Sequence, residues 1–233
     1  MTPVTSRFDC QNETEKTAGL EAARAAIAAR QCVVLPTDTV YGIAADAFSP
    51  QAVATLLAAK GRGRTMPPPV LIPRAATLDG LAADVNDDAR ALAEAFWPGP
   101  LTLILRSQPS LTWDLGETRG TVALRIPDDA LARELLEATG PLAVSSANRT
   151  GHPAAATAAE AEEQLGGSVE VYLEDGQRPV AGEPLASTIV DCTGEVPAVV
   201  RQGALPLDEL RRVVPSVLGL GEERLGEEPA TQP

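Results

Sequence analysis

The stretch "TVALRIPDDALARELLEATGPLAVSS", residues 121–146, decides the fold class. Residues 121–126 and 141–146 are short apolar segments typical of buried strands, and residues 129–140 between them carry a helical pattern. A strand, a helix and a second strand in succession favour parallel pairing through a crossover connection. The stretch therefore predicts an α/β fold.

The same alternation continues on both sides of this stretch. We expect strands at residues 32–35, 40–46, 70–72, 101–106, 169–173, 187–192 and 198–203, and helices at 17–30, 50–60, 77–84, 87–96, 157–165 and 206–214. Ser49 and Gly61 are suited to cap the helix at 50–60. We expect one domain over residues 18–214, preceded by a polar arm at 1–17 and followed by a disordered acidic tail at 215–233.

Composition limits the classes of function. The chain has 233 residues, of which 44% are hydrophobic, so it can bury a sizeable core. No apolar run approaches the roughly 20 residues of a membrane helix, which predicts a cytoplasmic protein with no membrane partner. Three well-separated cysteines without CxxC spacing predict reduced thiols rather than disulfides or a zinc site. A formal net charge of -13 disfavours extended contact with nucleic acid.

The basic segment "AAKGRGRTM", residues 58–66, stands out in this acidic chain. Lys60, Arg62 and Arg64 are compatible with solvated charges at a helix C-terminus, where the dipole favours cations. Alternatively, they clamp a polyphosphate, because the glycines between them allow close approach of the backbone to a ligand. The segment is not a Walker-type loop.

Other polar groups interrupt apolar strands. Arg125 and Arg201 each lie in one, and a buried arginine needs a carboxylate or phosphate, supplied either by an internal acidic residue or by a ligand. The segment "SSAN", residues 145–148, follows a strand at the position where α/β sheets usually bind ligands, although a plain polar turn is compatible with it. The chain has a single histidine, His152, which excludes a His-rich metal site. We expect this residue at the surface.

The order of these segments resembles a known family. "LPTDTVYGIAADAF", "KGR", "WPGPLTLIL", "TVALRIP", "SSANRTGHPA", "STIVD" and "VVRQGAL" follow one another as in the YrdC-like family of L-threonylcarbamoyladenylate synthases, across residues 18–207. The resemblance implies a twisted mixed parallel and antiparallel α/β sheet with helices around a large concave cavity. It also implies a nucleotidyltransferase reaction in which L-threonine, bicarbonate or CO2, and ATP yield threonylcarbamoyl-AMP and pyrophosphate. The product serves threonylcarbamoyladenosine modification of tRNA next to the anticodon.

The resemblance further implies roles for individual residues. Lys60 and Arg62 are the expected catalytic residues. The residues expected to bind ATP are Lys60, Arg62, Thr121, Ser146, Asn148 and Arg201. The residues expected to bind L-threonine are Thr39, Arg125, Ser145 and Ser187. Many relatives read "NPL" with a histidine soon after, where this chain has Met66 and then Leu71, so one polar contact to threonine is in doubt.

The expected partners follow from the same resemblance. Mg2+ is expected with ATP and without an all-protein metal site. Downstream threonylcarbamoyl transferase proteins are expected to use the product, and no stable direct tRNA binding is expected. Longer family members carry a second C-terminal domain, which we do not expect here.

Two rival functions are kept open. An RNA-binding or ribosome-maturation module would use a basic concave surface, although the charge and the 3% aromatic content argue against it. A paralogue would carry out carbamoyl-adenylate chemistry on another acceptor in the same cavity.

Overall fold

The computed structural model describes residues 6–222. Its strands are β1 (Ser6–Asp9), β2 (Val33–Leu35), β3 (Gly42–Asp46), β4 (Val70–Leu71), β5 (Ala82–Ala83), β6 (Leu101–Ser107), β7 (Thr121–Arg125), β8 (Leu142–Ser146), β9 (Val171–Glu174), β10 (Thr188–Asp191) and β11 (Ala198–Arg201). Its helices are α1 (Glu13–Ala28), α2 (Pro50–Lys60), α3 (Leu78–Leu81), α4 (Asp87–Phe96), α5 (Ala130–Thr139), α6 (Ala158–Leu165) and α7 (Leu207–Val213).

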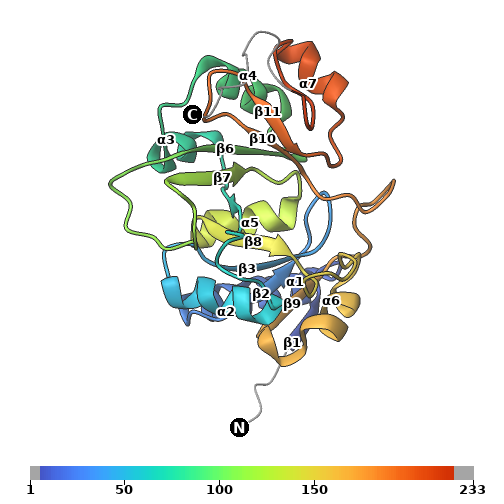
Figure 1. Ribbon diagram of the computed structural model, residues 1–233. Helices are drawn as coiled ribbons and strands as arrows, with labels where there is room; N and C mark the ends of the chain where they lie inside the picture. Colours follow the sequence, from blue (N-terminus) through green and yellow to red (C-terminus); the bar gives the residue numbers. More distant parts are fainter. Residues whose placement is uncertain (1–5, 223–233) are drawn as a thin grey trace.

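All of these strands join one mixed sheet, which confirms the predicted fold class. The order is β1-β9-β2-β3-β8-β4-β7-β6-β10-β11, with β5 paired to β6. The pairs β1/β9, β2/β9, β4/β7 and β6/β10 are parallel, and the remaining pairs are antiparallel. Figure 1 shows β1 and β11 at opposite ends of this sheet, with helices against its faces.

The two faces of the sheet bury different side chains because successive residues of a strand point to opposite sides. Along β7, Val122 and Leu124 enter a core that also contains apolar residues of α2, α3, α4 and α6. On the opposite face, α1 and α5 cover β9, β2, β3 and β8 through a second core. Where that opposite face continues over β4, β7 and β6, its side chains line a cavity instead.

Helix α2 ends where the sequence predicts, and the turn at its end sets the path of the basic segment, residues 58–66. The Ser49 side chain accepts a hydrogen bond from Ala52 N at 3.3 Å, which caps the start. Gly61 ends the helix in the left-handed conformation, with φ 63°, which glycine adopts without a steric penalty. The chain therefore turns sharply after Lys60.

One prediction drawn from residues 121–146 is wrong. Strands β7 and β8 do not pair in parallel, because β4 lies between them, parallel to β7 and antiparallel to β8. The parallel pairs come from other combinations of strands. In addition, the helix expected at 77–84 ends at Leu81 and is followed by β5.

The predicted ends of the domain also need correction. Residues 6–9 form β1 against β9 and α1 begins at Glu13, so the polar arm at 1–17 is wrong for residues 6–17. The disordered tail is wrong for residues 215–222, because Val217 is buried and Leu218 bridges Ala198. The rest of both predictions lies outside the described residues.

Candidate active site

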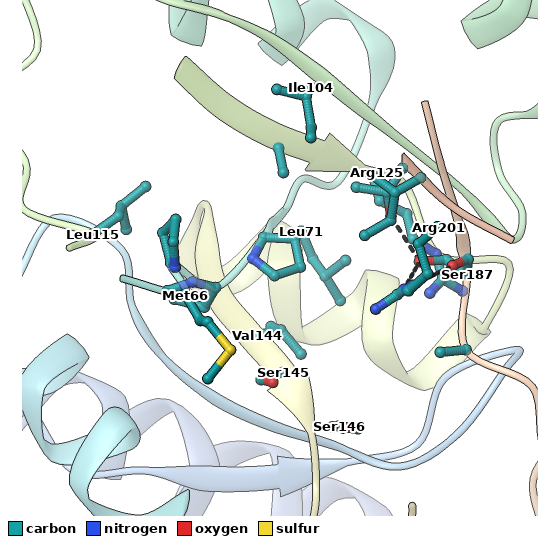
Figure 2. Close-up of a pocket in the computed structure, with 18 of the residues that line it drawn as sticks. Met66, Leu71, Ile104, Leu115, Arg125, Val144, Ser145, Ser146, Ser187 and Arg201 are labelled. Carbon is teal, nitrogen blue, oxygen red and sulfur yellow. Dashed lines mark hydrogen bonds between the residues drawn. The ribbon is translucent and has the colours of Figure 1, made fainter. Parts of the chain in front are cut away.

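A cavity of about 350 Å³ lies over the uncovered part of the sheet. Eight of the ten predicted site residues line it: Thr39, Arg62, Thr121, Arg125, Ser145, Ser146, Ser187 and Arg201. Figure 2 shows Arg125, Arg201 and Ser187 grouped on one side, with Met66 and Leu115 toward the other and Val144 between the two groups. The fold thus brings together side chains that lie up to 162 positions apart in the chain.

Arg125 is the most deeply buried cation of the cavity, with 7% of its side chain exposed. It donates from Nε to Gly99 O at 2.9 Å, from Nη1 to Thr39 Oγ1 at 3.1 Å and from Nη2 to Asp38 Oδ1 at 2.5 Å. Burial lowers the pKa of this guanidinium and the charge of Asp38 raises it. An internal carboxylate therefore pairs with Arg125, as one of the two alternatives from the sequence predicts.

Arg201 reaches the cavity from its rim. It donates from Nε and Nη2 to Ser187 O, at 3.1 and 2.7 Å, and from Nη2 to Ser187 Oγ at 3.0 Å. Ser187 Oγ in turn lies 2.8 Å from Thr102 Oγ1. Partial burial lowers the pKa of Arg201, and the charges of Arg125 and Arg62 lower it further.

Arg62 lies on the turn after α2 and donates from Nη1 to Ser145 Oγ at 2.9 Å. Its Nε is buried and makes no hydrogen bond to any described residue. Burial lowers the pKa of this group as well. Arg62 is therefore a cation with donor capacity still free for a ligand.

Lys60 and Asn148 lie behind the cavity wall rather than on it. The Lys60 ammonium, 3% exposed as a residue, donates to Ser146 O, to Asn148 O at 2.6 Å and to Asn148 Oδ1 at 3.4 Å. Asn148 Nδ2 donates to Arg149 O at 2.9 Å and His152 O at 2.8 Å. Both side chains hold the loop after β8, and their predicted contact with ATP stays a prediction.

The site carries more positive than negative charge. Lys60, Arg62 and Arg201 form no ion pair with a carboxylate of residues 6–222, whereas Arg125 is paired with Asp38. Burial, together with the charge of Arg62, lowers the pKa of Lys60 to about 8. Because only one of these four cations pairs with a carboxylate in the described part of the chain, the site favours a ligand with several negative charges.

Part of the remaining wall is apolar. Leu71, Ile104, Ala123 and Val144 line the cavity beside the charged groups. Leu71 lies directly beside Arg125 in the parallel β4/β7 register. Leu71 is thus a buried aliphatic side chain in the region where many relatives carry a histidine, and the polar contact to threonine that the sequence placed in doubt is not made by this residue.

The third cation of the basic segment lies outside the cavity. Arg64 pairs with Asp114 at 2.7 Å, with both side chains about half exposed. Glu117 N also donates to Arg64 O at 2.8 Å, so the loop between β6 and β7 rests on the basic segment. Of the two alternatives for the basic segment, Arg64 is a solvated charge, whereas Arg62 faces the cavity.

Sequence reasoning missed several polar groups of the site. Thr37 and Thr102 line the cavity, and Asp38 supports Arg125. Thr37 Oγ1 donates to Val40 O at 2.6 Å and accepts from Thr39 N at 3.2 Å, which fixes the turn. The motif "PTDT" marks this turn, and its two threonines at alternate positions were the available signal.

Within residues 6–222, no group of three or more His, Cys, Asp or Glu side chains is placed to hold a metal ion. Since no carboxylate lines the cavity there, these residues fit a metal that is bound mainly by a ligand. In the same part of the chain, no helix has the length and apolar character needed to cross a bilayer.

Comparisons with known proteins agree with the geometry of the site. The family model Sua5_yciO_yrdC, described as "Telomere recombination", matches residues 25–203. A "Putative threonylcarbamoyl-AMP synthase" of Mycobacterium tuberculosis is 49% identical over 211 residues, covering 91% of this chain and 96% of the relative. A "Threonylcarbamoyl-AMP synthase" of Pyrococcus abyssi is 36% identical over 183 residues, covering 78% of this chain and 53% of the relative.

A solved structure shares the fold. The crystal structure of P. abyssi Sua5 complexed with L-threonine has a TM-score of 0.81 and 31% sequence identity to this chain. The alignment covers 93% of this chain, which spans 62% of the length of the P. abyssi chain.

Proposed function

Because the chain belongs to the Sua5/YciO/YrdC family, we propose that it is a threonylcarbamoyl-AMP synthase. It makes threonylcarbamoyl-AMP and pyrophosphate from L-threonine, bicarbonate or CO2, and ATP. The observation that supports this most directly is the cavity, where Arg62 and Arg201 lie without a carboxylate partner in the described part of the chain and Arg125 lies among hydroxyl groups.

The reaction needs positioning and charge neutralisation more than a covalent nucleophile. The amine of threonine must lose a proton before it attacks CO2 to form a carbamate, and bicarbonate supplies the same carbon with loss of water. A carbamate oxygen then attacks the α-phosphorus of ATP, and the bond to the pyrophosphate oxygen breaks. Fixed cations lower the barrier to such a transfer because they stabilise charge that builds on the phosphates.

We assign this work to two groups of residues in the cavity. Arg125 keeps one unused N–H on Nη1 and one on Nη2, which together can donate to the threonine carboxylate. Arg62, whose guanidinium has free donors, is assigned to the phosphates, with Arg201 and Thr121 beside the nucleotide. Lys60 acts through the loop it holds, since its three donors already meet three oxygens.

Several parts of this function remain proposals of ours. Mg2+ would enter with ATP, held by its phosphates, and would screen their charge. Transferase proteins that place the threonylcarbamoyl group on tRNA would take the product, in the cytoplasm and without stable tRNA binding to this chain.

Pyrophosphate release tests the proposal when ATP, bicarbonate and single amino acids are supplied in turn. We expect threonine to stimulate release and serine or valine to do so weakly. Equal stimulation by another amino acid would instead support the paralogue. Filter binding to tRNA across a salt series tests the RNA-binding alternative, which predicts tight binding that weakens with salt.

A further inference from the structure

Asp38 lies at a position from which it can control Arg125 without touching a ligand. It sits between Thr37 and Thr39, whose side chains line the cavity, while Asp38 itself is not part of that wall. Its side chain is 14% exposed and meets Nη2 of Arg125 at 2.5 Å. Asp38 therefore contacts the guanidinium from behind, as seen from the cavity.

The same carboxylate oxygen also holds a second element. Asp38 Oδ1 accepts a hydrogen bond from Asp128 N at 3.0 Å, in the turn before α5, as well as the bond from Arg125. This oxygen thus ties the "PTDT" turn, the end of β7 and the start of α5 together. The backbone N–H of Asp128 on one side and the Arg125 side chain on the other fix its position.

With this support, three atoms of the guanidinium each have one partner. Gly99 O, Thr39 Oγ1 and Asp38 Oδ1 define the plane of the group and leave one N–H on Nη1 and one on Nη2. A planar fork gives bidentate recognition of a carboxylate only when its plane is held in place. Of the three partners, Asp38 is the only carboxylate.

We propose that Asp38 is a positioning residue for the amino-acid substrate: it orients Arg125 so that the free edge of the guanidinium receives the substrate carboxylate. This inference rests on the proposed function. The side chain acts through Arg125 and makes no contact with the reacting atoms.

Two substitutions separate orientation from charge. Asp38→Asn removes the negative charge but keeps an oxygen that can occupy the place of Oδ1, so both hydrogen bonds persist. Asp38→Ala removes both. We expect Asp38→Ala to raise the KM for threonine by about tenfold or more, with the KM for ATP within about twofold of wild type, whereas Asp38→Asn stays within about threefold for both substrates.

Asp128 supplies the matched control. Its carboxylate is 64% exposed and faces Arg133 at 3.8 Å, and its backbone N–H persists after substitution. Asp128→Ala should leave both KM values unchanged. Calorimetric titration of threonine in the absence of ATP should reproduce the order wild type, Asp38→Asn, Asp38→Ala.

The outcomes are distinct. If wild type shows no threonine-dependent pyrophosphate release, the proposed function fails and this inference fails with it. If wild type is active and Asp38→Ala binds threonine as well as or better than wild type, only the inference is overturned. Equal losses in Asp38→Asn and Asp38→Ala, or an equal rise in both KM values, would also overturn it, because these results indicate a role in charge or folding. Should Asp38→Ala fail to fold, Asp38→Glu decides, since its longer side chain displaces the oxygen and is expected to raise the threonine KM alone.

Discussion

Replacing Arg62 by alanine should separate catalysis from stability. We expect this cation to contribute little to the stability of the free protein, because its Nε is buried without a partner in the described residues and its charge lowers the pKa values of Lys60 and Arg201. Alanine loses one hydrogen bond to Ser145, worth about 0.5–1.5 kcal/mol, and removes that repulsion. The two effects nearly cancel, so the Tm should stay within about 4 °C of wild type.

Catalysis should respond very differently. A unit charge about 4 Å from a phosphate oxygen is worth about 4 kcal/mol at an effective dielectric constant of about 20. Removing one such donor typically lowers kcat by about 10²–10³-fold. We therefore expect Arg62→Ala to release pyrophosphate at about one hundredth of the wild-type rate or less, and to lose the rise in Tm that ATP gives wild type.

Arg64→Ala is the matched control, because this exposed cation lies two positions away and pairs with Asp114. It should retain activity within about threefold of wild type. Pyrophosphate release by Arg62→Ala at more than about one tenth of the wild-type rate would refute the assignment. An equal loss in Arg64→Ala would refute it as well, since the effect would then belong to the whole segment.

Three other properties are testable. Because the pKa of Lys60 falls to about 8 in the folded protein, the native state releases this proton before the unfolded state does, and stability gains from this group as pH rises above about 8. Urea titrations should show that the unfolding free energy of wild type rises by about 2 kcal/mol relative to that of Lys60→Met between pH 8 and about 9.5. A constant difference between the two proteins would contradict this. Gly116→Ala should lower the unfolding free energy by about 1–3 kcal/mol in the same titrations, because φ is 106° and a Cβ would lie 2.6 Å from Arg64 O; a stability equal to wild type would argue against that contact. All three thiols are buried with pKa raised to about 12, so a thiol reagent at pH 8 should label none of them until the protein unfolds. Rapid labelling of the native protein would show that a cysteine is accessible. These thiols are Cys10, Cys32 and Cys192.

Local signals in the sequence predicted local structure well. Helix α2 runs from Pro50 to Lys60 as expected, because Ser49 and Gly61 act within their own turns of chain. Strand β1 was missed because its four residues, "SRFD", contain one apolar side chain and lie at the edge of the sheet. The pairing of β7 with β8 could not be predicted, since β4, which separates them, comes from about 50 positions earlier.

Long-range contacts also limited what could be said of the site. Arg125 was identified as a buried arginine that needs an acidic partner, but Asp38 lies 87 positions away and nothing near Arg125 indicates it. The family resemblance implied that Lys60 is catalytic and binds ATP, and this stays a prediction. The loop after β8 covers the Lys60 side chain, and no pattern within the basic segment indicates that contact.

The alternation of side chains along β6 and β7 has a consequence for how the pocket can change. Leu103 and Leu124 belong to the core between the sheet and its helices, while their immediate neighbours Ile104 and Ala123 line the cavity. Exchanging every second residue would therefore redesign ligand preference while leaving the scaffold intact. Substitutions at the positions that line the cavity are therefore expected to cost less stability than substitutions at the core positions beside them.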